Sequence, residues 1–521
     1  MYRRQYLRAA AVAAGTGGAA AVSARDAARR ADASSGQPDT PTATDTTATG
    51  TPTATPTEPA ATPTSGWEPM GAVTVPGAAE TVVAPGGETA FVATGDGFAV
   101  LDLSDPADPT VRTRVGPVSP PGTDRVMPEI RDVKYDDGHL LVAGPASYHP
   151  DGYRGVARYD VRDPGAPAFV RAYETAFAVH NCYFADDVAY LTGRDDDRHP
   201  LVVVDIGPEP TEVARWSVLD HDEDWAEVDH SVRRIHDVWV QGGYAYLAYW
   251  DAGTWILDVS DPSDPRYVAN VTDRPIEELA NDTGLKIFRE FSEPPGNDHY
   301  VATSPDGTLM AVGQESWNSN AGVDETTPTG DDPGGPSGIE LYDITDRTSP
   351  ERVATIDPPP TADPNFNGVM TTAHNFQVGE QYLYSSWYQG GVKVHDVSDP
   401  TEPEEVRHFR RSSTTSFWTA QLSAPGEAVV ATSYLNPQDL EAPGVVYTFP
   451  DVPRPTPTPS PTPTAGSTDA STPTAAPTPN PTSAADPSPT PGATTGAGPG
   501  FGPLAALAAL GVGTWLLGDD E

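Results

Sequence analysis

A unit of four short strands recurs through the middle of the chain, and this repetition constrains the fold more than any other feature. The clearest part of each unit is an apolar, often β-branched strand that ends in aspartate and precedes a turn containing proline. The copies end at Asp102, Asp160, Asp205, Asp258, Asp343, Asp396 and, without the acid, Thr448. Units made of short strands separated by turns are typical of the blades of a β-propeller.

The fourth unit gives the expected blade most clearly. Its four strands are predicted at residues 237–240, 244–249, 254–258 and 266–271. The seventh unit stops after Val452 without a fourth strand, whereas a spare strand at 70–75 precedes the first unit. We therefore predict an all-β fold, a seven-bladed β-propeller of four-stranded blades over residues 69–452. The spare strand is expected to complete the last blade, because this removes a free sheet edge.

The same strands and turns resemble a known family. Residues 255–258 read Trp-Ile-Leu-Asp, and residues 260–265 read Ser-Asp-Pro-Ser-Asp-Pro. Such segments resemble the LVIVD repeat family, and the resemblance extends over the central block. It implies a β-propeller, in agreement with the strand pattern. In the turns, the Asp side chains are expected to cap the backbone while proline fixes φ.

The two ends of the chain indicate export and anchoring. Arg3 and Arg4 precede a short run rich in alanine and glycine, which resembles a twin-arginine export signal. Near the other end, Pro499-Gly500-Phe501 and an apolar run to Leu517 resemble the PGF-CTERM sorting segment of haloarchaeal surface proteins. These resemblances imply export and sorting machinery as partners, and a cell-surface protein anchored in the membrane by a C-terminal hydrophobic helix. The acidic tail that follows leaves open whether the segment is cleaved and lipidated or retained.

Composition divides the rest of the chain. Residues 33–68 and 453–498 consist mainly of Thr, Pro, Ser and Ala, which cannot bury enough apolar surface to fold. The expected organisation is an export signal region at 1–32, a disordered linker at 33–68, the propeller at 69–452, a stalk at 453–498 and the sorting segment at 499–521. Asn270 and Asn281 each begin an Asn-X-Thr triplet and are candidate glycosylation sites.

The charge of the chain excludes some partners. With 74 acidic and 31 basic residues, the net charge is −43. Such a chain repels nucleic acid and anionic lipid, so neither is expected to bind the folded domain. We interpret the acidity as an adaptation to a salt-rich, halophilic setting, where repulsion is screened. Cys182 is the single cysteine, so no internal disulfide can form, and we expect it to be a small buried apolar residue.

Long connections gather in one class of loop. The insertions fall in the loops between the second and third strands and between blades, at 144–155, 193–200, 220–234, 273–298, 314–338, 357–372 and 434–443. In a propeller these two classes of loop share one face. Loops carried by a rigid scaffold commonly form binding sites, although insertion on a freer face without a function is the alternative.

Histidines recur at the start of the inner strand. Aligning this position across the seven blades gives Glu80, Arg131, His180, His236, His299, His374 and Trp418. The inner strands line the central channel of a propeller, so these side chains are expected at the mouth of the channel. The adjacent Asp132 and Asp237 are expected in the same cluster.

Two interpretations of this cluster stay open from the sequence. Imidazoles of His180, His236, His299 and His374 are suitable ligands for copper, zinc, iron or nickel, and Asp237 could orient a ring. Alternatively, the histidines bond one another and water in a polar channel and have a structural role.

Other loops offer weaker candidates. The acidic loop at 220–230 contains His221 and His230, but a solvated acidic loop explains it as well. The acidic loop at 324–335 lacks the spacing of a calcium loop. The sequence contains no nucleophile elbow, phosphate-binding glycine loop or zinc-protease helix.

Two classes of function follow. The first is a binding or interaction module that presents its loop-rich face to a protein, a glycan or a small ligand. The alternative is a metal-dependent enzyme, such as an oxidoreductase, that uses copper, zinc or iron at the channel histidines. A purely structural role in a surface layer is a third possibility.

Overall fold

A computed structural model describes residues 66–453, except 195, 281, 283, 291, 319–333, 366–367, 425 and 437–442. The described residues up to Val452 fall within one compact unit. The export signal region and the sorting segment lie outside the described residues, as do nearly all of the linker and nearly all of the stalk. Among the described residues, no helix combines the length and apolar character needed to cross a membrane.

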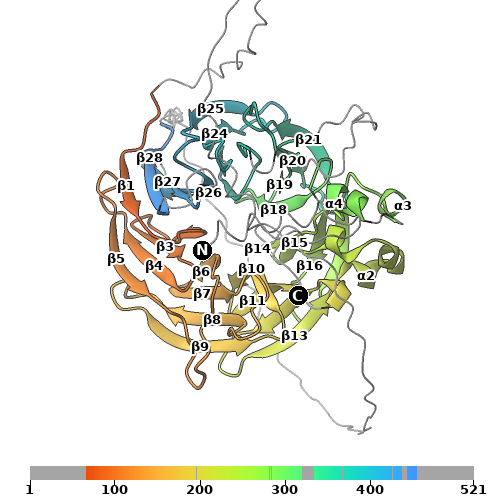
Figure 1. Cartoon of the computed structure of the whole chain (residues 1–521), viewed down its shortest axis with the longest axis horizontal. Helices are drawn as coiled ribbons and strands as arrows, with labels where there is room; N and C mark the ends of the chain where they lie inside the picture. Colours follow the sequence, from red (N-terminus) through yellow and green to blue (C-terminus); the bar gives the residue numbers. More distant parts are fainter. Residues whose placement is uncertain are drawn as a thin grey trace, which may run out of the picture. The chain divides into compact units, whose positions relative to one another are not determined.

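The unit is a β-propeller of seven antiparallel sheets, each with four strands. Figure 1 shows the sheets arranged around a common centre, with the chain passing from one blade to the next in sequence order. The predicted fold class is therefore confirmed, and the fourth blade has its strands at the predicted positions.

Blades one to three contain β2 (Thr81–Val83), β3 (Thr89–Ala93), β4 (Phe98–Asp102), β5 (Thr110–Val115), β6 (Asp132–Asp136), β7 (His139–Gly144), β8 (Gly155–Asp160), β9 (Ala168–Glu174), β10 (Ala178–Ala185), β11 (Val188–Arg194), β12 (Leu201–Asp205) and β13 (Thr211–Trp216). Blades four and five contain β14 (Asp237–Gln241), β15 (Tyr244–Ala248), β16 (Thr254–Asp258), β17 (Arg266–Val271), β18 (Asp298–Thr303), β19 (Leu309–Gln314), β20 (Ile339–Asp343) and β21 (Glu351–Ile356). Blades six and seven contain β22 (Phe376–Val378), β23 (Tyr382–Ser386), β24 (Val392–Asp396), β25 (Glu404–Phe409), β26 (Phe417–Ala424), β27 (Ala428–Ser433), β28 (Val445–Pro450) and β1 (Gly71–Thr74).

Burial follows the position of a strand within its blade. The middle strands lie between neighbouring blades, so both of their faces are covered and they are almost continuously apolar, as in β12. The outer strand β5 alternates between exposed and half-buried residues because only one of its faces is covered. The core consequently lies between blades, where Trp216 of the third blade packs against Tyr249 and Trp255 of the fourth.

The first strand in the chain closes the ring. β1 pairs with β28 in antiparallel register from Gly71 opposite Thr448 to Thr74 opposite Val445, and Figure 1 shows it beside β28. Trp67 adds to this closure because its Nε1 donates to the oxygen of Pro450 at 2.8 Å. Its ring also stacks on Phe449 with centroids 4.6 Å apart. The predicted completion of the last blade by the spare strand is confirmed.

The repeated aspartate has a structural role. In each of six blades its Oδ1 accepts a hydrogen bond from the backbone N–H two residues later, as Asp258 does from Ser260 at 2.9 Å. A second aspartate three residues further on repeats this bond, as Asp261 does with Ser263. These Asx turns connect the third and fourth strands and explain why the motif recurs.

The few helical turns lie in the connections between strands. They are η1 (Asp196–Arg198), α2 (Val218–His221), η2 (Glu223–Glu227), η3 (His230–Arg233), α3 (Ile276–Leu279) and α4 (Leu285–Glu290). All but η1 belong to the two connections that flank the fourth blade, which are the most elaborate of the described loops.

Candidate functional site

Strand register places the long connections on one side of the ring. Asp237, which opens β14, pairs with Ala248, which ends β15. The loops that lead into an inner strand and those that leave the second strand therefore share one edge. We call this edge the loop-rich face. It carries the connections at 116–131, 145–154, 195–200, 217–236, 272–297, 315–338, 357–375 and 434–444. The connection at 116–131 was not among the insertions expected from the sequence.

Four histidines form a contiguous row at this face. The ring centroids of His180 and His236 are 4.6 Å apart, those of His236 and His299 are 3.8 Å apart, and those of His299 and His374 are 4.7 Å apart. All four side chains are buried. The row continues to Trp418, whose ring lies 4.1 Å from that of His374. The structure thus brings together the histidines that the sequence alignment placed at one position.

A local irregularity of the inner strand positions these rings. The backbone N–H of His236 donates to the oxygen of Ala248, and that of His374 donates to the oxygen of Ser386. In the fourth blade, Ala248 is also the strand partner of Asp237, the residue after His236. Two successive residues of the inner strand therefore face one residue of the second strand. The pairing of β18 shifts between Asp298 and Tyr300, so His299 occupies the extra position. Such bulges redirect a side chain away from the regular alternation of a strand.

Glu80 does not belong to the histidine row. In the first blade, the backbone N–H of Ala79 donates to the oxygen of Ala93 at the end of the second strand. Ala79 thus takes the place that His236 and His374 have in their blades, and Glu80 is the residue after it. Its carboxylate instead accepts from Asn375 Nδ2 at 2.6 Å. The sequence alignment was one residue off in this blade, because a bulge changes the spacing without leaving a signal in the residue types.

Residues one position below the row form an acid ring of Glu80, Asp132 and Asp237. Lys134 forms an ion pair with Asp132, and Asn181 Nδ2 donates to Asp237 Oδ2 at 2.7 Å. Burial raises the pKa of Glu80 to about 7 and the pKa of Asp237 well above its usual range. Desolvation of Glu80 and Asp237 outweighs the attraction of Lys134, so both carboxyl groups favour the protonated form more than exposed acids do.

Arg131 borders the row from the second blade. One of its terminal nitrogens donates to Tyr434 Oη at 2.6 Å, and the other pairs with Glu129 Oε1 at 2.8 Å. Its guanidinium also lies 5.9 Å from the centre of the Trp418 ring. Arg131 and Trp418 therefore close the side of the cluster where blades two and seven supply no histidine.

Glu315 joins the cluster although the sequence analysis did not single it out. Its Oε2 lies 2.9 Å from His299 Nδ1, and the hydroxyl of Tyr388 donates to its other oxygen. It is the residue after β19 and lies within the insertion predicted at 314–338. Trp250 and Tyr388 hold the corresponding places after β15 and β23 and also face the histidines. Comparing the ends of the second strands would have revealed this position.

Trp250 and Tyr388 adopt an unusual backbone conformation. Their φ angles are 51° and 45°, in the left-handed region that bulky residues rarely occupy. Each is fixed by paired backbone bonds to the next blade, Trp250 with Asp298 and Tyr388 with Phe417. This conformation directs both rings at the histidine row. Strain of this kind is typically retained at functional positions.

The cluster combines neutral imidazoles with an ionised carboxylate. Burial lowers the pKa of His374 to about 3 and lowers the pKa values of His180 and His236 well below their usual range. Burial alone would raise the pKa of Glu315, but the adjacent His299, with smaller contributions from His374 and Tyr388, holds it below the usual value. Imidazole nitrogens and a carboxylate are therefore present together in a buried site.

The second histidine candidate does not assemble. His221 packs on Tyr267 with ring centroids 3.8 Å apart. His230 Nδ1 instead lies 3.2 Å from His199 Nε2. Most of the acidic loop at 324–335 lies outside the described residues.

Other candidate residues are placed as follows. Asn270 lies half-buried on β17, where its Oδ1 accepts from Tyr267 Oη at 2.9 Å, and Asn281 lies outside the described residues. Cys182 is fully buried, and burial raises the pKa of its thiol well above the usual value. Cys182 is therefore not a reactive thiol in the folded protein.

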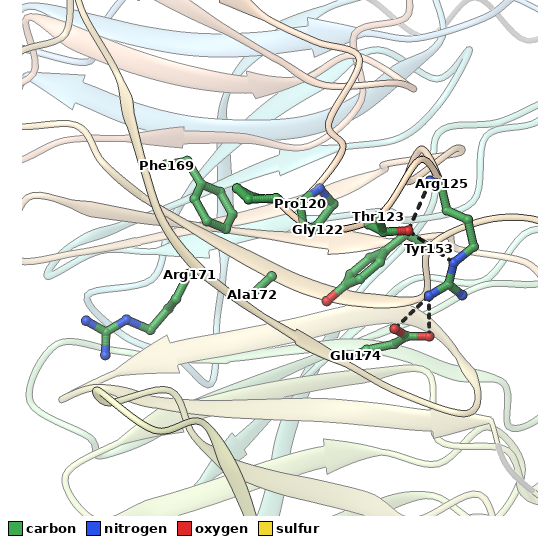
Figure 2. A pocket seen from close by; sticks show the side chains of 10 residues that line it. Pro120, Gly122, Thr123, Arg125, Tyr153, Phe169, Arg171, Ala172 and Glu174 are labelled. Atoms are coloured by element: carbon green, nitrogen blue, oxygen red, sulfur yellow. Dashed lines mark hydrogen bonds and ion pairs between the residues drawn. The ribbon is translucent and has the colours of Figure 1, made fainter.

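A cavity of about 490 Å³ lies between the connection at 116–131 and β9. Figure 2 shows Arg125 reaching Glu174 across its rim, at 2.7 and 2.8 Å from the two carboxylate oxygens. Tyr153 and Phe169 supply aromatic surface, and Pro120 and Pro121 supply part of the wall. This cavity is on the outer strand of the second blade and is separate from the histidine row.

Comparison with known proteins finds the predicted repeat in three of the blades. The family model described as LVIVD repeat matches residues 76–116, 233–273 and 372–410, which lie in the first, fourth and sixth blades. No curated protein matches the chain. Among solved structures, the chain is similar to the β-propeller domain of Cps50 (Swd1) from Myceliophteria thermophila. The two share 9% identity, the TM-score is 0.48, and the alignment covers 73% of this chain and 99% of that one.

Proposed function

We propose that this protein is exported, anchored at the cell surface, and binds a partner through the loop-rich face of its propeller. The observation that carries the proposal concerns the described residues: their long connections lie on that face, while their turns on the opposite face are short. A rigid ring that holds many variable loops on one side is suited to recognition, because the scaffold limits the ordering cost of binding.

The proposed location rests on the ends of the chain. The twin-arginine-like start and the PGF-CTERM-like end are the features that support export and membrane attachment. The Thr- and Pro-rich segments between these ends and the propeller would hold the domain away from the membrane. The strong negative charge supports a salt-rich surrounding, in which an acidic surface keeps the protein soluble.

The chemistry of the loop-rich face narrows the class of partner. Its most elaborate described loop exposes Asp222, Glu223, Asp224 and Glu227 around the buried Trp225. In the second blade, the same face exposes Tyr148 beside the guanidinium of Arg154. Acidic loops with an accessible aromatic ring favour a protein, glycan or small ligand whose surface is neutral or cationic, and disfavour nucleic acid.

Location is tested on intact cells that produce the full chain. Protease added outside is expected to remove the propeller while a cytoplasmic marker stays intact. A chain with Arg3 and Arg4 replaced by lysine is expected to stay inside, and one lacking residues 499–521 is expected to appear in the medium. Full protection of the normal chain from external protease would contradict surface exposure.

Binding through the loop-rich face is tested by photo-cross-linking on the cell surface. A photoreactive residue is placed at Tyr148 or Glu223 on that face, and at Ser263 or Thr401 in the short turns opposite as matched controls. Cross-linked products are expected from the first two positions and not from the controls. Equal cross-linking from both faces would contradict the proposed binding surface.

A further inference from the structure

The inner end of the loop-rich face contains a group of side chains with metal-ligating atoms. One such atom from each of His299, Glu315 and His374 lies within 4.8 Å of the other two, and all three side chains are buried. We propose that these three residues bind a divalent first-row transition-metal ion, with zinc and iron(II) the best matches to the ligand set. This inference goes beyond partner binding and does not depend on it.

The spacing of the three ligand atoms suits such an ion. Ligands of zinc lie about 2.0–2.2 Å from the metal, so neighbouring ligands in a tetrahedral shell are roughly 3.4 Å apart. The separation of 2.9 Å between His299 Nδ1 and Glu315 Oε2 and the outer limit of 4.8 Å bracket this value.

Backbone contacts fix which nitrogen of His374 is free. Its Nδ1 lies 2.6 Å from the oxygen of Trp418, which can only accept, so Nδ1 carries the hydrogen. The lone pair is therefore on Nε2, and this buried atom has no hydrogen-bond partner. A histidine that donates one ring N–H to a backbone oxygen and leaves the other nitrogen free has the arrangement typical of metal ligands.

His236 repeats this arrangement next to the proposed ion. Its Nδ1 lies 2.9 Å from the oxygen of His299, and its buried Nε2 also lacks a partner. Two buried nitrogens without partners are costly, by about 1–3 kcal/mol each, unless something binds them. The ring of His236 stacks on that of His299 but is not one of the three grouped ligands, so we expect His236 to border the ion rather than to bind it.

Charge favours the same conclusion. Glu315 would bring one anionic oxygen ligand to the ion, and His299 and His374 would each bring one imidazole nitrogen. Tyr388 engages one oxygen of Glu315 and leaves the other directed at His299. Two imidazoles and one carboxylate are a common set for zinc and for iron(II), and both ions then retain open positions.

The same geometry also permits a cluster without metal, in which Glu315 and His299 simply form an ion pair. The two arrangements differ in a measurable way. A metal site binds one ion per chain. Replacing a ligand should abolish metal binding, whereas replacing a buried histidine elsewhere should not. His395 is a suitable control because it is buried in the sixth blade, on β24, but is not part of the group.

The test uses the full chain without a histidine tag, stripped with chelator in high salt. Zinc, cobalt(II), copper(II) and anaerobic iron(II) are added separately, and bound metal is measured by elemental analysis after dialysis. One equivalent of zinc or iron is expected, and cobalt is expected to give the visible absorption of a site with nitrogen and oxygen ligands. Glu315→Gln and His374→Gln should weaken binding by on the order of 100-fold or more, and His395→Gln should leave it unchanged.

Tyr388→Phe provides a second, milder variant. It keeps the ring and removes only the bond to Glu315, so it should fold normally and weaken binding by about 10- to 100-fold. Circular dichroism confirms that each variant is folded. The proposal is overturned if the stripped wild-type chain binds no stoichiometric ion. It is equally overturned if His395→Gln and folded Tyr388→Phe both bind as the wild type does while Glu315→Gln loses nothing.

Discussion

The Nδ1 atom of His374 lies 2.6 Å from the backbone oxygen of Trp418, which joins the histidine of the sixth blade to the inner strand of the seventh. His236 makes the same connection to the fifth blade through the oxygen of His299. Each of these bonds lets a side chain near the channel link adjacent sheets. The histidines therefore contribute to the ring itself, whatever they bind.

The acid sensitivity of the fold should depend on His374. Its pKa is about 3 in the folded protein, against about 6.5 in an unfolded chain, so the unfolded state binds more protons between these values. Its contribution to stability is therefore complete above pH 6.5 and is lost as the pH falls. Between pH 7.5 and 5.0, the stability difference between wild type and His374→Gln should shrink by about 2 kcal/mol.

Urea unfolding at the two pH values, in chelator and constant salt, measures this change. His139→Gln, at a half-buried position at the start of β7, serves as the matched control for the loss of a histidine. A difference between wild type and His374→Gln that stays constant from pH 7.5 to 5.0 would show that His374 is not held neutral by burial.

Asp298 should act in the opposite direction. Burial raises its pKa to about 8, and its oxygens accept from Thr254 Oγ1 at 2.7 Å and Gln314 Nε2 at 3.3 Å. Between pH 4 and 8 the folded state therefore holds a proton that the unfolded state has released, and stability falls as pH rises. Asp298→Asn cannot lose that proton.

The stability of Asp298→Asn relative to wild type should accordingly improve by a few kcal/mol from pH 5 to pH 8. Denaturant titrations at both pH values provide the measurement, and exposed Asp151→Asn is the matched control. Parallel pH profiles for wild type and Asp298→Asn would rule out the raised pKa.

Closure of the ring should depend on Trp67. This side chain stacks on Phe449 and donates to Pro450, which holds the segment before β1 against β28. Trp67→Ala should cost about 3–5 kcal/mol, the usual range for deleting a buried tryptophan. Met70→Ala, at a position 37% exposed in the same segment, should cost little. Denaturation midpoints compare the two, and similar losses for both would indicate that closure does not rely on Trp67.

Salt should stabilise the folded protein. A net charge of −43 makes the compact state repel itself, and the Debye length falls from about 10 Å at 0.1 M to about 3 Å at 1 M salt. Melting temperature should rise by several degrees over this range with sodium or potassium chloride. The rise should be similar for both salts because screening depends on ionic strength. A flat or falling melting curve would refute screening as the cause.

The fold was predictable because its pattern repeats. Asp258 and its counterparts mark the same turn in six blades, so each copy supports the others, and the spare strand before β2 had one place to pair. The site was less predictable. A bulge displaces Glu80 by one residue relative to the histidines, and periodicity of apolar residues does not record such a shift. Glu315 was not predicted because it follows β19 at the start of a long loop, and the residues at the corresponding places in the fourth and sixth blades, Trp250 and Tyr388, are of other types.

The pairing of β1 with β28 also sets the order in which the protein can be completed. Gly71 and Thr448 meet in one sheet although 377 positions separate them. At about 5–20 residues per second, a ribosome needs on the order of 20–75 seconds to make the intervening chain. During that interval β1 has no neighbour, so the last blade is sealed only after synthesis has passed β28.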